Sequence, residues 1–304
     1  MSAYFVCVGN VTFDKLYWVD RLPVLDDVAT VRGEADCIGG RGAIVAALCA
    51  RLGIPVSLIT TLPDAVSTQA ERFLNEYGAS GRLIGYRAGA APSRVTAIIG
   101  REEQNCISLF HPGLTNPDPA PDQVSAVRAA SLAYFTTHDI QANIKLLAAV
   151  ADSTRVIINM TAYMMRNQAY LAHCTKRAHV LIGNEAELSA FLTATGCRQA
   201  SGLFDRLPRL ERAFVTLGAR GVEVFSSGRD RFRLPALAAE VKTPLGVGDA
   251  FAAGVCYGEY LNLPPDRSAD IGLRLAALSI ASSATCPPAQ DIDHLAIQPL
   301  KGTP

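Results

Sequence analysis

The sequence has 304 residues, of which 49% are hydrophobic and 18% charged, and Lys plus Arg equals Asp plus Glu at 28 each. This composition is typical of a packed globular protein and excludes a chain that is disordered over most of its length. The balanced charge argues against nucleic acid or an anionic membrane as the partner, so a small molecule is expected. The length suits one α/β domain of about 250 residues with a small appendage.

The first residues and the cysteines indicate the compartment. No cationic stretch precedes the first apolar segment, and no apolar run approaches about 18 residues, so we expect neither a secretory signal nor a membrane span and predict a cytoplasmic protein. The eight cysteines are scattered without CxxC spacing, which indicates buried thiols. A zinc site built from distant cysteines and histidines is the less favoured alternative.

The first predicted element is a buried strand at Tyr4–Gly9, followed by a loop that contains Asn10 and Asp14. A helix is predicted over Gly40–Leu52, because apolar side chains recur there at helical spacing and a glycine follows. The start of this helix is rich in glycine, in the segment Gly39-Gly40-Arg41-Gly42. These glycines could form a hinge and the floor of a pocket, or simply a turn into the helix.

Beyond this helix, short apolar segments alternate with helical ones. The predicted strands are 56–60, 132–136, 155–160 and 180–183, and the predicted helices lie near 65–77, 141–152, 164–173 and 185–193. Such alternation is typical of βαβ units, so we predict an α/β fold with a three-layer, doubly wound, mainly parallel sheet. Ligands bind at the carboxyl ends of the strands in such a sheet.

Two regions interrupt the alternation, namely Val28–Cys37 and the strand pair Arg94–Gly100 and Cys106–Phe110. We interpret residues 28–37 and 94–110 as a small β lid inserted in an α/β domain made of residues 1–27, 38–93 and 111–304. A lid of this kind would exclude water from a site. The free strand edges of the lid predict a homodimer that forms through it. The Pro-rich stretch Pro112–Pro121 is predicted to be a loop.

The strongest local pattern is the glycine-rich segment Thr243–Gly254. Gly246 and Gly248 make a tight turn, and small apolar residues then continue as a helix, so the backbone N–H groups near 246–249 would point at one spot that suits an anion. Asp249 lies in the first helical turn, where it is either functional or simply a helix-stabilising carboxylate. The glycines fit neither the GxGxxG nor the P-loop pattern, which argues against dinucleotide oxidoreductases and P-loop NTPases.

Two further segments each allow a chemical and a structural interpretation. Asn184 and Glu187 lie where a predicted strand ends and a helix begins. Their oxygen atoms could lie near magnesium and phosphate, or they could form a capping box. The segment Thr216–Gly221, with the sequence Thr-Leu-Gly-Ala-Arg-Gly, could let a nucleotide approach the backbone, or it could be an ordinary glycine hairpin.

In their order and approximate spacing these motifs resemble the ribokinase-like (PfkB) family of sugar and nucleoside kinases, over nearly residues 4–290. The resemblance is carried by Gly-Asn-x-x-x-Asp at 9–14, Gly-Gly-x-Gly-Ala at 39–43, Asn-x-x-Glu at 184–187, Thr-Leu-Gly-x-x-Gly at 216–221 and Gly-x-Gly-Asp at 246–249. It implies transfer of the γ-phosphate of ATP to a hydroxymethyl group of a small sugar or nucleoside, with Mg²⁺ as a cofactor.

The resemblance also implies a role for each residue of these motifs. Asp249 matches the catalytic base, and Gly246, Val247 and Gly248 match the anion hole. The positions on the substrate side are Asp14, which would bind substrate hydroxyls, and Asn10, Gly39, Gly40 and Arg41. The positions on the nucleotide side are Asn184, Thr216, Gly218 and Gly221, while Glu187 matches a residue that organises magnesium through water.

The sequence departs from the family pattern at several positions. Thr243, Leu245 and Val247 replace the usual Asp, Thr and Ala of the glycine-rich turn, which makes a monovalent-cation site doubtful. Ile44 stands where many sugar kinases carry an asparagine that contacts a substrate hydroxyl, so the substrate is expected to be less polar at that face, as a nucleoside or an unusual sugar would be.

Two questions stay open at the level of the sequence. The aromatic residues Phe13, Tyr17 and Phe110 could stack on a base, or they could fill the core or the lid. The altered turn also allows a catalytically weak or inactive family member that binds a sugar or nucleotide as a regulator. The joint presence of Asp249, Asn184 and Glu187 favours the active kinase.

Overall fold

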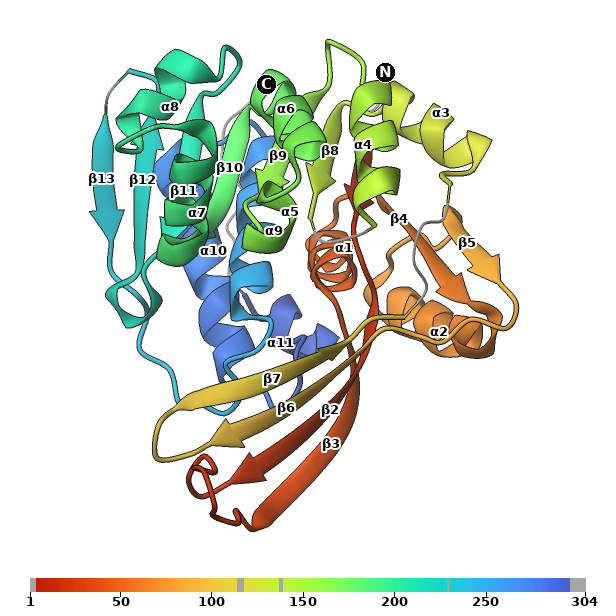
Figure 1. Ribbon diagram of the computed structural model, residues 1–304, viewed down its shortest axis with the longest axis vertical. Helices are drawn as coiled ribbons and strands as arrows, with labels where there is room; N and C mark the ends of the chain where they lie inside the picture. Colours follow the sequence, from red (N-terminus) through yellow and green to blue (C-terminus); the bar gives the residue numbers. More distant parts are fainter. Residues whose placement is uncertain (1–3, 114–117, 137–138, 229, 296–304) are drawn as a thin grey trace.

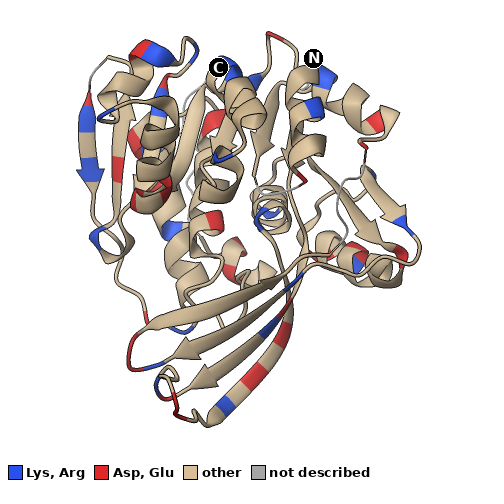
Figure 2. Cartoon of the chain, viewed as in Figure 1, with Lys and Arg blue, Asp and Glu red and all other residues tan. Residues whose placement is uncertain are grey.

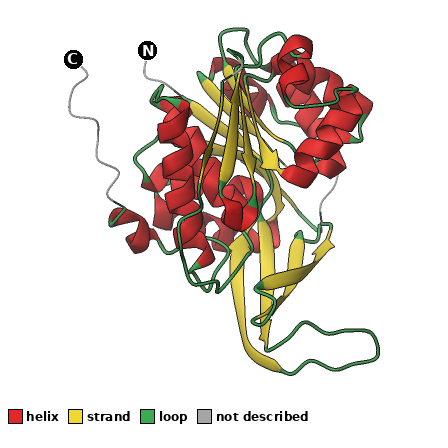
Figure 3. Ribbon diagram, turned by 90° about the vertical axis from the view of Figure 1, so that its left-hand side faces the viewer, coloured by secondary structure: helices red, strands yellow, loops and turns green. Residues whose placement is uncertain are grey.

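A computed structural model describes residues 4–113, 118–136, 139–228 and 230–295 of the chain. Within these ranges a nine-stranded sheet lies between two layers of helices, and a separate four-stranded sheet projects from one end of this domain (Figures 1 and 3). Acidic and basic residues are interspersed over both units (Figure 2). The predicted fold class, a three-layer α/β domain with a small β lid, is confirmed.

The large sheet is parallel over most of its width. The strand order is β13-β12-β11-β10-β9-β8-β1-β4-β5, and only β12 and β13 run antiparallel to their neighbours, as hairpins at one edge. The strands are β1 Phe5–Val8, β4 Val56–Pro63, β5 Ile84–Arg87, β8 Leu132–Phe135, β9 Arg155–Asn159, β10 Val180–Asn184, β11 Arg212–Thr216, β12 Val222–Ser226 and β13 Arg231–Leu234.

Helices cover both faces of the sheet because its central strands are apolar on both sides. In β1, for example, Phe5 and Cys7 belong to one hydrophobic core, while Val6 and Val8 belong to the other. The helices on the first face are α1 Arg41–Arg51, α2 Ser67–Tyr77, α9 Val247–Tyr260, α10 Pro265–Ile280 and α11 Ala289–Asp293. Those on the second face are α3 Pro121–Ala129, α4 Ile140–Ala149, α5 Ala162–Met165, α6 Gln168–Arg177, α7 Glu185–Thr195 and α8 Ser201–Arg206.

The lid sheet differs from the prediction in one strand. Its order is β3-β2-β6-β7, formed by β3 Val31–Gly39, β2 Thr12–Val19, β6 Arg94–Gly100 and β7 Asn105–His111. The segment Thr12–Val19 was expected in the α/β domain, with Asp14 in a loop. Instead the chain leaves β1 and enters the lid directly, and Asp14 is a strand residue. Buried Asp14 and Leu16 alternate with partly exposed Lys15 and Tyr17, as expected of a strand, and pairing with β3 and β6 places this strand in the lid.

A second difference concerns the predicted helix over 164–173, which is two helices, α5 and α6. The division falls at Asn167, whose side chain accepts a hydrogen bond from the Tyr170 N–H at 3.0 Å and so caps the start of α6. In the predicted loop Pro112–Pro121, residues 114–117 lie outside the described ranges, and Pro121 already begins α3.

The eight cysteines are all free, and five of them are fully buried. Among the residues that the structure describes, no group of His, Cys, Asp and Glu side chains is placed to hold a metal ion. No helix in the described ranges is both long and apolar enough to cross a bilayer.

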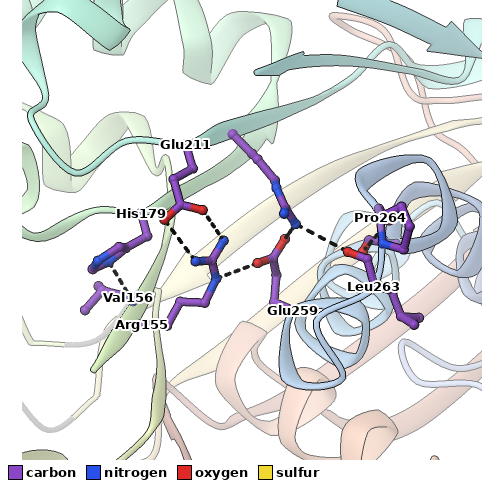
Figure 4. Close-up of polar contacts among 9 residues, drawn as sticks. Arg155, Val156, His179, Glu211, Glu259, Leu263 and Pro264 are labelled. Carbon is purple, nitrogen blue, oxygen red and sulfur yellow. Dashed lines mark hydrogen bonds and ion pairs between the residues drawn. The ribbon is translucent and has the colours of Figure 1, made fainter. Parts of the chain in front are cut away.

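The C-terminal end of α9 is tied to the sheet by a network of charged side chains (Figure 4). The carboxylate of Glu259, whose side chain is 1% exposed, accepts hydrogen bonds at 2.6 Å from Arg155 Nε and from Arg212 Nη1. Arg155 also pairs with both oxygens of Glu211, at 3.1 and 2.8 Å. Because Arg155 and Arg212 begin β9 and β11, the network joins α9 to the amino ends of two strands.

We predict that Glu259→Ala lowers the free energy of unfolding by about 3–5 kcal/mol, because two guanidinium groups lose a shared buried partner. Urea denaturation followed by circular dichroism measures this. A matched control is Asp270→Ala, which removes an exposed ion pair with Arg274 one helical turn away and is expected to cost less than about 0.5 kcal/mol. Equal and small effects of the two substitutions would contradict the prediction.

Candidate active site

A cavity of about 900 Å³ lies where the lid meets the large domain. Its walls come from the loop after β1, from the first residues of α1, α4 and α9, and from strands β6 and β7 of the lid. Six of the predicted site residues line it, namely Asn10, Asp14, Gly40, Arg41, Gly246 and Asp249. The structure thus brings together these six residues from three distant parts of the sequence, namely 10–14, 40–41 and 246–249.

The N-terminus of α9 is open toward this cavity. Gly246 is the residue before the helix and has a left-handed backbone, with φ of 79°, and a Cβ at this position would lie 1.9 Å from the carbonyl oxygen of Thr285. No side chain caps the helix, and its first internal bond is donated by the Ala250 N–H to Gly246 O at 2.8 Å. Space above Gly248 is open. The free N–H groups of the first turn therefore suit an anion.

Asp249 lies partly buried in this first turn of α9, on the wall of the cavity. Burial raises the pKa of its carboxyl group from 3.8 to about 6, because the charged form loses water; Arg41 nearby opposes the rise and Glu187 adds to it. A carboxyl group with such a pKa is ionised near neutral pH and can still accept a proton, which suits a general base.

Arg41, the first residue of α1, connects the cavity to a second cluster of polar groups. Its Nη1 donates to Asn159 Oδ1 at 2.9 Å and to Glu187 Oε1 at 3.1 Å. Its backbone N–H donates to Asn10 Oδ1 at 3.1 Å. The side chain is 34% exposed. The guanidinium group is therefore held between Glu187 and the cavity, close enough to influence the pKa of Asp249.

Asn159 is a residue of this cluster that the sequence analysis did not single out. It ends β9, is buried, and its Nδ2 donates to the hydroxyl of Tyr134 at 2.9 Å. The available signal was its place at the carboxyl end of a parallel strand, the same signal that drew attention to Asn184. Its neighbouring residues contain no glycine-rich or capping motif that would have marked it.

Asn184 and Glu187 form the capping box that the sequence allowed. Asn184 Oδ1 accepts from the Glu187 N–H at 2.9 Å, and Glu187 Oε2 accepts from the Asn184 N–H at 3.0 Å. The other carboxylate oxygen of Glu187 accepts from Arg41. With these oxygens already bonded, the pair does not offer a ready set of direct metal ligands. What fits is a contact of Glu187 to magnesium through water, with phosphates supplying most other oxygens.

Asp14 lies across the cavity on β2 and is 4% exposed. Burial raises the pKa of its carboxyl group to about 6. Within the described ranges, Asp14 Oδ1 and Thr12 Oγ1 have no hydrogen-bond partner. Buried polar atoms are rarely left unpaired. Both atoms are therefore suited to receive the hydroxyl groups of a bound ligand.

Close packing explains why both residues before Arg41 are glycines. A Cβ at Gly39 would lie 2.0 Å from Asp14 Oδ2, so a larger residue there would displace the carboxylate. Gly40 has φ of 98°, and a Cβ there would lie 2.6 Å from the carbonyl oxygen of Asn10. These close approaches pack the start of α1 against the loop after β1 and against β2.

The segment Thr216–Gly221 is a hairpin between β11 and β12 with a 3₁₀ turn at Gly218–Arg220. Gly221 has φ of 93°, and a Cβ there would lie 2.0 Å from the carbonyl oxygen of Leu234, whereas the space at Gly218 is open. Thr216 is paired with Asn184 in the sheet. Asn184, Thr216, Gly218 and Gly221 form a second group beside the cavity and do not line it.

The three candidate aromatic residues lie on different faces of the lid. Phe13 and Tyr17 line a separate cavity of about 710 Å³ between the lid and α2. Phe110 lines the same cavity as Asp14 and Asp249. Of the three, only Phe110 is therefore placed to contact a ligand near Asp249.

The altered residues of the glycine-rich turn have different surroundings. Thr243 is fully buried, and its hydroxyl has no hydrogen-bond partner within the described ranges. Leu245 lines the cavity and packs against the lid cluster of Leu16, Ala97 and Ile99. Val247 is the first residue of α9 and keeps its backbone N–H at the helix start. The turn thus joins the lid to the anion site.

Comparison with known proteins places the chain in a family. Residues 2–292 match the model of the pfkB family carbohydrate kinases. The chain belongs to the pfkB family. An ATP-dependent ribose-1-phosphate kinase from Halopiger xanaduensis is 26% identical over 251 residues, which cover 81% of each chain. The predicted family and the predicted enzyme class, a phosphotransferase that acts on an alcohol group, are confirmed.

Solved structures of a ribokinase and of a nucleoside kinase share the fold. The ribokinase of Cryptococcus neoformans var. grubii in complex with ADP has a TM-score of 0.80 at 19% identity, over 96% of this chain and 99% of that one. The Burkholderia thailandensis nucleoside kinase in complex with inosine has a TM-score of 0.79 at 18% identity, over 96% of both chains. At these identities the likeness concerns the fold.

We predict opposite effects of alanine at the two glycines of the turn. Gly246→Ala is expected to lower the free energy of unfolding by at least about 1–3 kcal/mol, because its backbone is left-handed and its Cβ would meet Thr285. Gly248→Ala has open space in a helical position, so it is expected to keep or raise stability by up to about 1 kcal/mol. Thermal unfolding of both variants measures this. Equal losses would contradict the geometry.

Proposed function

We propose that this pfkB-family kinase transfers the γ-phosphate of ATP to a hydroxymethyl group of a small sugar or nucleoside, with Asp249 as the base. One observation carries the proposal. A partly buried carboxyl group, whose pKa desolvation raises to about 6, lies in the uncapped first turn of α9, in the same cavity as the unpaired carboxylate oxygen of Asp14. A general base and an anion site are thereby adjacent to a group that binds hydroxyls.

In this mechanism Asp14 holds substrate hydroxyls and orients the reactive hydroxymethyl group toward Asp249. The carboxylate of Asp249 accepts the hydroxyl proton as the oxygen forms a bond to the γ-phosphorus, and the bond from that phosphorus to the bridging oxygen breaks to leave ADP. The N–H groups at 246–249 stabilise the negative charge of the transferred group. Phosphoryl transfer depends mainly on such positioning and charge stabilisation.

The nucleotide is proposed to lie over the hairpin Thr216–Gly221 and beside Asn184. Support comes from the pairing of Thr216 with Asn184 and from the open space at Gly218, which allow close approach to the backbone. Magnesium bound with the nucleotide would neutralise phosphate charge, and Glu187 would contact it through water. Arg41 is held by Glu187 beside Asp249 and would add positive charge near the transferred phosphoryl group.

We predict that Asp249→Asn lowers kcat by about 10²–10⁴-fold, because the proton acceptor is lost. The same substitution is expected to raise the free energy of unfolding at pH 7.5, since a partly desolvated charge is removed. ADP release with a panel of pentoses, hexoses and nucleosides measures the first effect, and urea denaturation the second. Unchanged ADP release would show that Asp249 is not the base, and ligand binding without turnover in the wild-type protein would support a regulatory role.

The stabilisation by Asp249→Asn depends on pH in a defined direction. The pKa of Asp249 is raised on folding from 3.8 to about 6, so the folded state binds the proton more tightly, and the wild-type protein loses stability as pH rises from about 4 through 6. The advantage of the variant is therefore present at pH 7.5 and small near pH 4. The pKa of Asp14 shifts in the same direction, mainly through burial, and the charge of Asp249 is a further cause of that shift, so Asp249→Asn is expected to reduce the rise of the Asp14 pKa as well.

We also propose that the lid forms a homodimer. Its outermost strands are β3 and β7, and side chains on both are exposed, with Val31 at 49%, Ile107 at 42% and Leu109 at 54%. Apolar side chains along open strand edges favour pairing with a second copy. Light scattering at micromolar concentration is expected to give twice the chain mass of 32.3 kDa, and Leu109→Glu to reduce it. A wild-type monomer would refute the proposal.

A further inference from the structure

We infer that the substrate is an unphosphorylated nucleoside whose base lies between Phe110 of the lid and Tyr163 of α5. This inference rests on the proposed function, because it takes the cavity at Asp249 as the site of the phosphate acceptor. Of the two substrate classes in the proposed function, a sugar and a nucleoside, we infer the nucleoside.

The first observation is the exposure of two aromatic side chains in one cavity. Phe110 is 55% exposed and Tyr163 is 67% exposed, and both line the cavity that contains Asp249. The third exposed aromatic residue of the described chain, Tyr86, lies elsewhere and donates its hydroxyl to Glu71. Burial of a large aromatic side chain contributes much binding free energy. A flat ligand that covers Phe110 and Tyr163 would therefore bury apolar surface that is exposed to solvent in the protein alone.

The second observation is the origin of these two side chains. Phe110 belongs to β7 of the lid, whereas Tyr163 belongs to α5 of the large domain. A flat base held between the two units would contact both aromatic side chains and would favour a closed lid. A free pentose has no aromatic face for either residue. The volume of about 900 Å³ is also near the upper end of the roughly 300–1,000 Å³ found for pockets of drug-sized ligands.

The third observation is that two side-chain amides also line the cavity. They belong to Gln141 of α4 and to Asn167, which immediately precedes α6. Asn167 Oδ1 caps α6, so its NH₂ group is free to donate elsewhere. Neither this group nor the side-chain amide of Gln141 bonds to a described residue, and it is the backbone N–H of Gln141 that donates to Asp139. Amide groups offer both donors and acceptors to the polar edge of a base.

The charges of the cavity argue against a substrate that already carries a phosphate. Among its described lining residues, Arg41 is the sole Lys or Arg, and its guanidinium group is engaged by Glu187 and Asn159. The remaining charged residues of the lining are acidic, namely Asp14, Asp139 and Asp249. A substrate phosphate would face these carboxylates, and no second Lys or Arg among the described lining residues would balance its charge.

The test measures binding by calorimetry without ATP, with cytidine, guanosine, D-ribose and ribose 1-phosphate as probes. At least one of the two nucleosides is expected to bind 10-fold or more tightly than D-ribose and ribose 1-phosphate. Phe110→Ala and Tyr163→Ala are each expected to weaken nucleoside binding by about 5- to 150-fold, the range that corresponds to base–aromatic stacking, and to leave D-ribose binding unchanged. Tyr163→Phe is expected to retain the affinity.

Tyr86→Ala is the matched control, because it removes an exposed aromatic side chain outside the cavity and is expected to change none of these affinities. Substitutions at such exposed positions seldom alter stability by more than about 0.5 kcal/mol, and circular dichroism verifies folding. Equal affinity for ribose and both nucleosides, tighter binding of ribose 1-phosphate, or equal losses for ribose in the two alanine variants would overturn the inference. Nucleoside binding with the expected variant pattern but without ADP formation would instead refute the proposed kinase reaction.

Discussion

The partly buried carboxylate of Asp249 is the constraint to which the rest of the site responds. Desolvation raises its pKa to about 6, so keeping it ionised near neutral pH costs about 3 kcal/mol. Arg41 offsets part of the desolvation, whereas the nearby charge of Glu187 adds to the rise. A dry site is nevertheless what phosphoryl transfer to an alcohol requires, because water would compete for the phosphoryl group.

A helix that carries such a charge must be fixed by contacts elsewhere. At its start, Gly246 lets the backbone turn against the carbonyl group of Thr285, and Leu245 packs into the lid cluster. At its end, Glu259 is held by Arg155 and Arg212 at the amino ends of two strands. The helix is therefore anchored at both ends, and the lid contacts the same turn that forms the anion site. A shift of the lid would therefore move the residues at the N-terminus of α9, through the contact of Leu245 with the lid cluster.

The sequence was sufficient for the fold because its signals are local. Strand and helix periodicities, the glycine before α9 and the capping pattern at Asn184 each follow from neighbouring residues, and their order led to the correct family. The features that the sequence analysis missed depend on contacts between residues far apart in the sequence. Whether Thr12–Val19 joins the lid is decided by hydrogen bonds to β3 and β6. Asn159 belongs to the site because β9 ends beside Arg41, and no nearby motif marks it.

The competing interpretations of Glu187 turn out to be compatible. One carboxylate oxygen completes the capping box of α7, while the other accepts from Arg41. Capping fixes the carboxylate, the carboxylate fixes the guanidinium group, and the guanidinium group lowers the cost of the charge on Asp249. Asp14 has no such cation and keeps an unpaired oxygen. Hydrogen-bond donors on a bound substrate would favour its charged form. The charge on Asp249 is thus offset in part within the protein, by Arg41, whereas under the proposed function the charge on Asp14 would be offset by the bound substrate.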